Sequence, residues 1–139
     1  MGQDISSEKA VAKIMKQKIL GDYYIGHEQI QVVLREGNGA EYYTCPEKGS
    51  LPRIKIGMDQ KNWKYIVGIL IHEATEFLLG RIHARYEDAE DLGKDASGYL
   101  FVLNHVQLVD INTRLADFLV DVLPSFAVEW KKWNKIKTK

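Results

Sequence analysis

Residues 60–80 read QKNWKYIVGILIHEATEFLLG and decide the architecture of the chain. Apolar side chains occupy most of the circumference that this segment would have as a helix: Trp63, Ile66, Val67, Leu70, Ile71, Ala74, Phe77 and Leu78. A helix that is apolar nearly all round is buried in the protein rather than lying on its surface. We therefore predict a central helix from 60 to about 80, with Asp59 as its N-cap.

Three polar residues with metal-binding chemistry interrupt this apolar helix. His72 and Glu76 are four residues apart, so on a helix they share one face and can reach a single ion. Glu73 is rotated by about 100° and lies beside that pair, where it can hold a metal-bound water. The spacing is that of H-E-x-x-H with glutamate in place of the second histidine, and a carboxylate is a normal zinc ligand.

Burial of these acids is the physical reason to expect a metal. An unpaired buried carboxylate costs on the order of several kcal/mol, and a divalent cation is the simplest group that offsets this cost. The alternative is that Glu73 and Glu76 face solvent while His72 is a hydrogen-bonded core histidine. The sequence favours the metal site because the surrounding helix is so apolar.

A third protein ligand is needed, and two histidines are candidates. His83 lies eleven residues beyond His72, about 16 Å along a continuous helix, so it can bind only if the helix breaks at Gly80. His105 lies on the next predicted helix, which can pack antiparallel to the first. We favour His105, with His83 as the alternative third ligand. Two aspartates are also candidates: Asp110 and Asp117.

The elements around the central helix indicate an α+β fold in a single domain, 1–139. A first amphipathic helix is predicted from about 6 to 20, with Gly21 as its stop. A second long helix is predicted from about 97 to 122, interrupted by Pro124. Between the first and central helices, frequent glycines and prolines separate short β-prone runs of a small, mostly antiparallel sheet: 29–35, 40–44 and 53–56.

The C-terminal tail, about 128–139, combines lysines with Trp130 and Trp133. Basic and aromatic residues together are also found where proteins bind nucleic acid or membrane surfaces. We expect instead that this segment is a terminal helix that packs its two indoles on the body of the domain and leaves its lysines in solvent.

Composition excludes several classes of protein. The 139 residues include 19 basic and 19 acidic side chains, so a generic polyanion-binding protein is not expected. No apolar run approaches the roughly 20 residues of a membrane span. Cys45 is the single cysteine, which fits a reducing compartment, and we predict a cytoplasmic location. Gly2 fits the myristoylation pattern, although we expect an unmodified N-terminus.

The chain resembles the zincins, and more narrowly short phage and prokaryotic zincin-like proteins of similar length. Residues 69–76, Ile-Leu-Ile-His-Glu-Ala-Thr-Glu, match the active-site helix of that family. The segment from Asn104-His105 to Leu119, with its regularly spaced leucines, matches the helix that follows. The resemblance covers about residues 52–123, and glutamate at position 76 departs from the commonest zincin pattern.

The resemblance implies an activity and a set of roles. His72, Glu76 and His105 would hold Zn²⁺, and Glu73 would be the general base of a metallopeptidase that acts on a peptide or protein substrate. Zincin substrates commonly add as a strand to a sheet edge, for which 53–56 is the candidate here. The oxyanion donor is left open among three residues: Tyr65, His83 and Tyr99.

Two other functions fit parts of the pattern. The fold can serve as a catalytically inactive zincin-like module that binds or regulates a partner, with or without a structural metal. An HD-type metal phosphohydrolase is the other alternative, because its helix can carry a similar L-H-D-x-x-E sequence. That family usually supplies an earlier histidine from a preceding helix, whereas His27 lies in the predicted sheet region.

Overall fold

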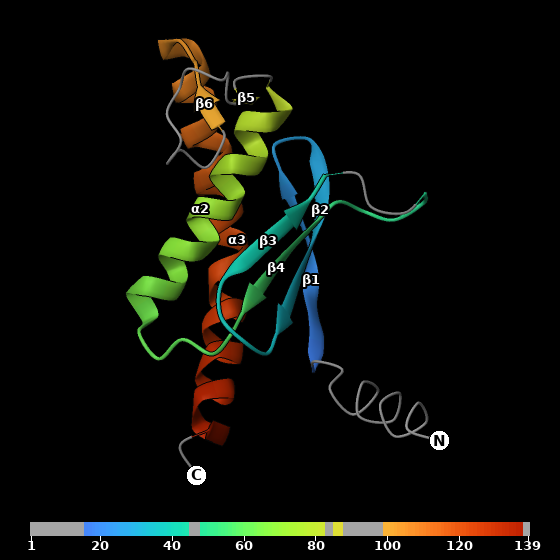
Figure 1. Ribbon diagram of the computed structural model, residues 1–139, viewed down its shortest axis with the longest axis vertical. Coiled ribbons are helices and arrows are strands. Elements are labelled where there is room, and N and C mark those ends of the chain that lie inside the picture. Colours follow the sequence, from blue (N-terminus) through green and yellow to red (C-terminus); the bar gives the residue numbers. More distant parts are fainter. Residues whose placement is uncertain (1–15, 45–47, 83–84, 88–98, 138–139) are drawn as a thin grey trace, which may run out of the picture.

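The computed structural model describes residues 16–44, 48–82, 85–87 and 99–137. They form a four-stranded sheet, a two-stranded sheet and two helices (Figure 1), which confirms the predicted α+β class. The strands of the larger sheet are β1 (Gln17–Ile25), β2 (Glu28–Arg35), β3 (Ala40–Tyr43) and β4 (Arg53–Gly57). The smaller sheet pairs β5 (Arg85–Glu87) with β6 (Tyr99–Phe101), and the helices are α2 (Trp63–Arg81) and α3 (His105–Lys137).

The larger sheet is mixed, with the strand order β1-β2-β4-β3. The β1/β2 and β3/β4 pairs are antiparallel, whereas β2 and β4 run parallel. The three β-prone runs predicted from the sequence correspond to β2, β3 and β4. The expected edge at 53–56 is wrong, because β4 lies between β2 and β3. Among the described strands, β3 instead has a neighbour on one side only.

The predicted N-terminal helix is wrong over its last residues. Residues 17–20 belong to β1, which continues through Gly21 to Ile25 and pairs with β2 as a hairpin. The register shifts between Ile19 and Gly21, so the glycine marks a bulge rather than the end of a helix. Pairing with β2 therefore overrides the local helical pattern. Residues 6–15 of that prediction lie outside the described residues.

Both helices pack on one face of the larger sheet (Figure 1). Alternate residues of the strands point into this interface, so Ile30, Val32 and Leu34 of β2 are fully buried. Ile66 and Leu70 of α2 are equally buried against them. One side of α2 is thus buried against the sheet and α3, whereas Lys64, Tyr65, Gly68 and His72 are exposed, so α2 is less buried than the sequence predicts.

Helix α2 begins at Trp63, and its N-cap is Asn62, whose side chain accepts a hydrogen bond from the Tyr65 N–H. The predicted N-cap, Asp59, has a different role. Its carboxylate accepts hydrogen bonds from the Gly37 N–H, at 2.7 Å, and from the Trp133 indole, at 3.1 Å. Asp59 therefore joins the β2–β3 turn to α3 instead of starting α2.

Helix α3 differs from the prediction at both ends. It begins at His105 rather than near 97, because Asn104 caps it through reciprocal hydrogen bonds with Gln107. It also continues through Pro124 to Lys137. Pro124 is exposed, and Val122 and Phe126 on either side of it are fully buried, so their packing maintains the helix across the missing N–H.

The C-terminal indoles pack on the domain as expected. The Trp130 N–H donates to the Gln60 carbonyl oxygen at 2.6 Å, and the Trp130 ring lies 5.2 Å from that of Trp63. Lys131 and Lys132 on the same turns are exposed. None of the helices described has the length and apolar character needed to cross a membrane.

Candidate metal site

The middle of α2 carries the one group of three candidate ligands found among the described residues. Ligand atoms of His72, Glu73 and Glu76 all lie within 4.8 Å of one another. The His72 Nε2 and Glu76 Oε2 atoms are 3.6 Å apart. The helical spacing therefore brings together three of the four residues that we predicted for the metal site and its base.

The exposure of the three residues contradicts the alternative in which both glutamates face solvent and the histidine lies in the core. The Glu73 residue is 8% exposed and is the only buried charged residue in the described part of the chain. The Glu76 side chain is 18% exposed, whereas the His72 side chain is 65% exposed. The acids are thus shielded and the histidine is open, which leaves an imidazole available to a ligand that enters from solvent.

Electrostatics at Glu73 are unfavourable for its charged form. Burial raises the pKa of its carboxyl group, and the negative charges of Glu76 and Glu41 raise it further, while His72 acts in the opposite direction. No hydrogen bond from another described residue reaches the Glu73 carboxylate. A cation at this position would supply the compensation that the described residues do not.

The donor set fits zinc. Imidazole nitrogen and carboxylate oxygen are both common zinc ligands, at about 2.0–2.2 Å from the ion. Two such ligands of one tetrahedral ion lie about 3.3–3.6 Å apart. The 3.6 Å between His72 Nε2 and Glu76 Oε2 agrees with that separation. The same donors also suit other divalent metals, so the geometry supports a cation more directly than it selects zinc.

The other candidate histidines that the structure describes lie outside this group. His105 is the exposed first residue of α3 and is not a member of the group. His83, the alternative third ligand, lies outside the described residues. His27, which the phosphohydrolase alternative would require, is exposed in the turn between β1 and β2 and also lies apart from the group.

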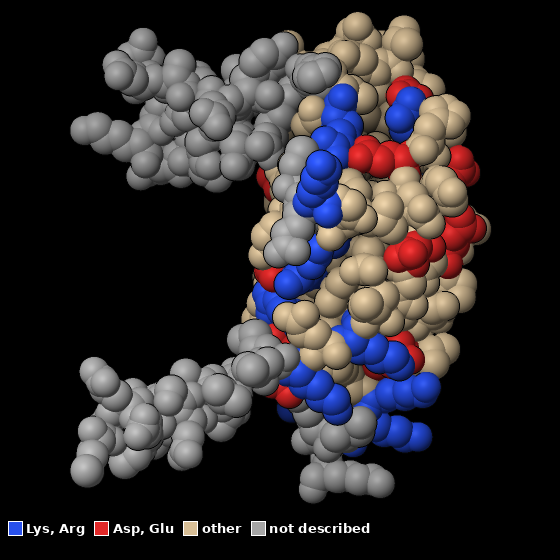
Figure 2. Space-filling view, turned by 90° about the vertical axis from the view of Figure 1, so that its right-hand side faces the viewer, with Lys and Arg blue, Asp and Glu red and all other residues tan. Residues whose placement is uncertain are grey.

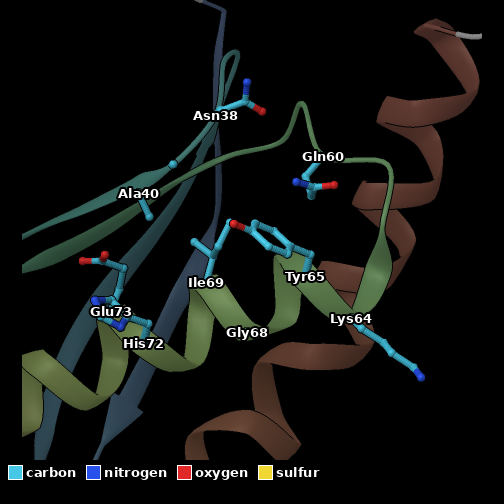
Figure 3. Close-up of a pocket in the computed structure, with 10 residues that line it drawn as sticks. Asn38, Ala40, Gln60, Lys64, Tyr65, Gly68, Ile69, His72 and Glu73 are labelled. Carbon is cyan, nitrogen blue, oxygen red and sulfur yellow. The ribbon is translucent and has the colours of Figure 1, made fainter.

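A cavity of about 760 Å³ opens beside the group, between α2 and the start of β3 (Figure 3). His72 and Glu73 form one end of it, and the side chains of Tyr65 and Ile69 lie along α2 from that end. Tyr65, one of the predicted oxyanion donors, therefore lines the cavity, with 62% of its surface exposed. The remaining lining residues are Asn38, Gly39, Ala40, Gln60, Lys64 and Gly68.

The turn before β3 is a wall of this cavity that the sequence did not assign to the site. Gly37 and Gly39 have positive φ angles of 91° and 77°, and the turn folds back until Gly57 N–H donates to the Gly39 carbonyl at 2.8 Å. A Cβ on Gly57 would meet the Gly37 oxygen at 2.5 Å. The sequence places glycines between the β-prone runs 29–35 and 40–44, but only the fold shows that this segment faces α2.

Comparison with known proteins leaves the site to be judged on its geometry. No protein-family model, no curated protein and no solved structure matches the chain.

Proposed function

We propose that this chain is a zinc-dependent peptidase of the zincin type, in which His72 and Glu76 hold the metal and Glu73 is the general base. One observation carries the proposal: three donors of a buried helix converge next to a cavity and the open edge of a sheet. A solvated helix face would not combine a nearly buried carboxylate with an adjacent exposed imidazole.

The chemistry divides between the metal and Glu73. A zinc ion here would lower the pKa of a bound water towards about 7 and polarise the peptide carbonyl. Glu73 accepts a proton from the attacking water and returns it to the leaving amine. The Glu73 residue as a whole is only 8% exposed, which limits the access of competing water to that proton transfer. Tyr65 is the cavity residue with a hydroxyl that can donate to the developing oxyanion.

Strand β3 provides a place for an extended peptide. The Gly57 N–H bond to Gly39 shows which residues of β3 face β4, and by alternation the backbone N–H and carbonyl of Ala40 face the open edge. Ala40 also lines the cavity with His72 and Glu73. A peptide added to this edge would place its backbone beside the metal ligands.

Metal content tests the first half of the proposal. Protein purified without a histidine tag should contain about one equivalent of zinc by mass spectrometry. The single variants H72A and E76A should lose it, and H27A, in an exposed turn, should retain it. H105A and H83A then identify the third ligand: we expect zinc to be retained in H105A, because His105 lies outside the ligand group. A metal-free wild-type protein would contradict the proposal.

Peptidase turnover tests the second half of the proposal, the role of Glu73 as general base. E73Q should retain zinc and lose peptidase activity by about 10²–10⁴-fold, the usual contribution of general acid–base catalysis. Activity can be followed on a library of fluorogenic peptides at cytoplasmic pH, because a cytoplasmic location is part of the proposal. Loss of zinc in E73Q would make Glu73 a ligand rather than the base. Wild-type protein that holds zinc but cleaves no peptide would favour the alternative of a binding or regulatory module.

A further inference from the structure

The face of the larger sheet that points away from α2 and α3 carries a second set of functional groups. Alternation along the strands determines this set, because the intervening residues are buried under the helices. Figure 2 looks onto this side of the molecule and shows Lys and Arg side chains in a line along it. We call the following outward residues the open sheet face: Gln17, Ile19, Asp22, Tyr24, Gln29, Gln31, Val33, Arg35, Glu41, Tyr43, Arg53 and Lys55.

Two cations at the centre of the open sheet face have no anionic partner among the described residues. Arg53 and Lys55 are alternate residues of β4, and neither forms an ion pair there. The Arg53 Nε is buried and has no hydrogen-bond partner. A buried donor without a partner is rare in native proteins and commonly indicates a missing water or ion.

The nearest acid on this face is already neutralised. Glu41, which pairs with Lys55 across the strands, accepts two hydrogen bonds from Arg35, at 3.0 and 2.8 Å. The remaining acid, Asp22, lies on β1, with Gln31 of β2 between it and Arg53. The centre of the face is therefore locally positive, although the whole chain has no net charge.

Aromatic and amide groups flank these cations. Tyr43 of β3 is 44% exposed, and the Lys55 ammonium lies 5.5 Å from the centre of its ring. Tyr24 of β1 is 58% exposed and pairs with Gln29. Flat π faces beside cations suit a ligand that has both bases and phosphates, because bases stack on aromatic rings while Arg and Lys bind the phosphates.

We propose that the open sheet face binds single-stranded nucleic acid. Arg53 and Lys55 bind its phosphates, Tyr43 stacks against an unpaired base, and the Gln31 amide offers hydrogen bonds to base edges. A duplex hides its base faces and cannot stack in this way, and an acidic peptide has no base to stack. This binding surface is on the side opposite the candidate metal site and does not depend on it.

Fluorescence anisotropy of a labelled 12-residue oligothymidylate tests the proposal. Binding should weaken as salt rises, with a slope of roughly −1.4 in log K against log salt, the value for two phosphate contacts on a single strand. The double variant R53Q/K55Q should bind at least 10-fold more weakly than wild type. The matched variant K131Q/K132Q, which removes two exposed lysines from α3, should bind within about twofold of wild type.

A second variant keeps the test independent of the partly buried Arg53 side chain. Y43A removes an exposed ring from the edge strand and should weaken binding about 5- to 150-fold, the range for loss of one stacked base. H72A should bind like wild type, which separates this proposal from the peptidase. The proposal is wrong if oligothymidylate does not bind at 50 mM salt, if both double variants lose affinity equally, or if duplex DNA or polyglutamate competes as well as the unlabelled oligonucleotide.

Discussion

Helices α2 and α3 pack on the same face of the sheet, but their polar groups differ in kind. Along α3, the indole N–H groups of Trp130 and Trp133 donate to Gln60 and Asp59, and the 15%-exposed carboxylate of Glu129 is paired with Lys18 at 2.9 Å. Along α2, Glu73 is nearly buried and receives no hydrogen bond from the described residues. The difference indicates that α3 stabilises the domain, whereas α2 holds a carboxylate at a cost in stability, a cost that our proposal attributes to binding a metal ion.

The largest effect should come from the core of α3. F126A removes a fully buried ring that lies 5.8 Å from that of Trp63, and such truncations cost about 3–5 kcal/mol. Urea denaturation should show that loss in the free energy of unfolding. V128A, at a half-exposed position on the same helix, should change it by less than about 0.5 kcal/mol. Similar losses in the two variants would show that α3 does not stabilise the domain through its buried face.

On α2, by contrast, a substitution should increase the free energy of unfolding. E73Q replaces a buried charge with a neutral amide of the same shape, so the metal-free protein should gain roughly 1–3 kcal/mol at neutral pH. Chelator-treated wild type and variant can be compared by urea denaturation. Zinc should narrow this difference, because the charged Glu73 carboxylate is attracted to the ion in the wild type, whereas E73Q gains only the stabilisation from the ligands that both proteins share.

The pH dependence of this gain has a defined sign. Burial raises the pKa of Glu73 in the folded state, so the carboxyl group is neutral in both states at low pH and costs nothing there. The cost develops as the pH rises from the ordinary glutamate range through the raised pKa. E73Q should therefore match metal-free wild type in acid and exceed its stability only above that range. A variant that is less stable than metal-free wild type at neutral pH would contradict this account.

The two helices also differ in how far the sequence could predict them. The apolar pattern of 60–80 was enough to locate α2 and to predict that His72, Glu73 and Glu76 lie together, because all three lie on one helix whose geometry is local. For α3 the sequence indicated a stop at Pro124, but the helix continues because residues on both sides of the proline are buried against distant elements. Local propensity does not contain that packing energy.

The same limit explains the remaining errors in the sheet and the site. Residues 17–20 have a helical pattern but form β1, because hydrogen bonds to β2 stabilise the strand. Glycines between the β-prone runs 29–35 and 40–44 separate β2 from β3, yet the position of this turn opposite α2 depends on the strand order β2-β4-β3. Predicting a third ligand on another element meets the same limit. Whether His105 reaches the group depends on where α3 begins and how it packs, and α3 begins after its N-cap, Asn104.

The smallest change in the free energy of unfolding should come from the hydrogen bond that joins Trp130 of α3 to Gln60, just before the start of α2. W130F keeps an aromatic ring beside Trp63, although a smaller one, and removes the indole N–H that donates to the Gln60 carbonyl at 2.6 Å; the lost hydrogen bond should cost about 0.5–1.5 kcal/mol. K131A, at an exposed position beside it, should cost almost nothing.

Zinc affinity in W130F should equal that of wild type, because Gln60 lines the end of the cavity away from His72 and Glu73. Isothermal titration of the metal-free variants with zinc checks this point, and urea denaturation checks the first. A weaker affinity for zinc in W130F would mean that α3 also positions the ligands of α2, so that stabilisation and metal binding are not separated between the two helices.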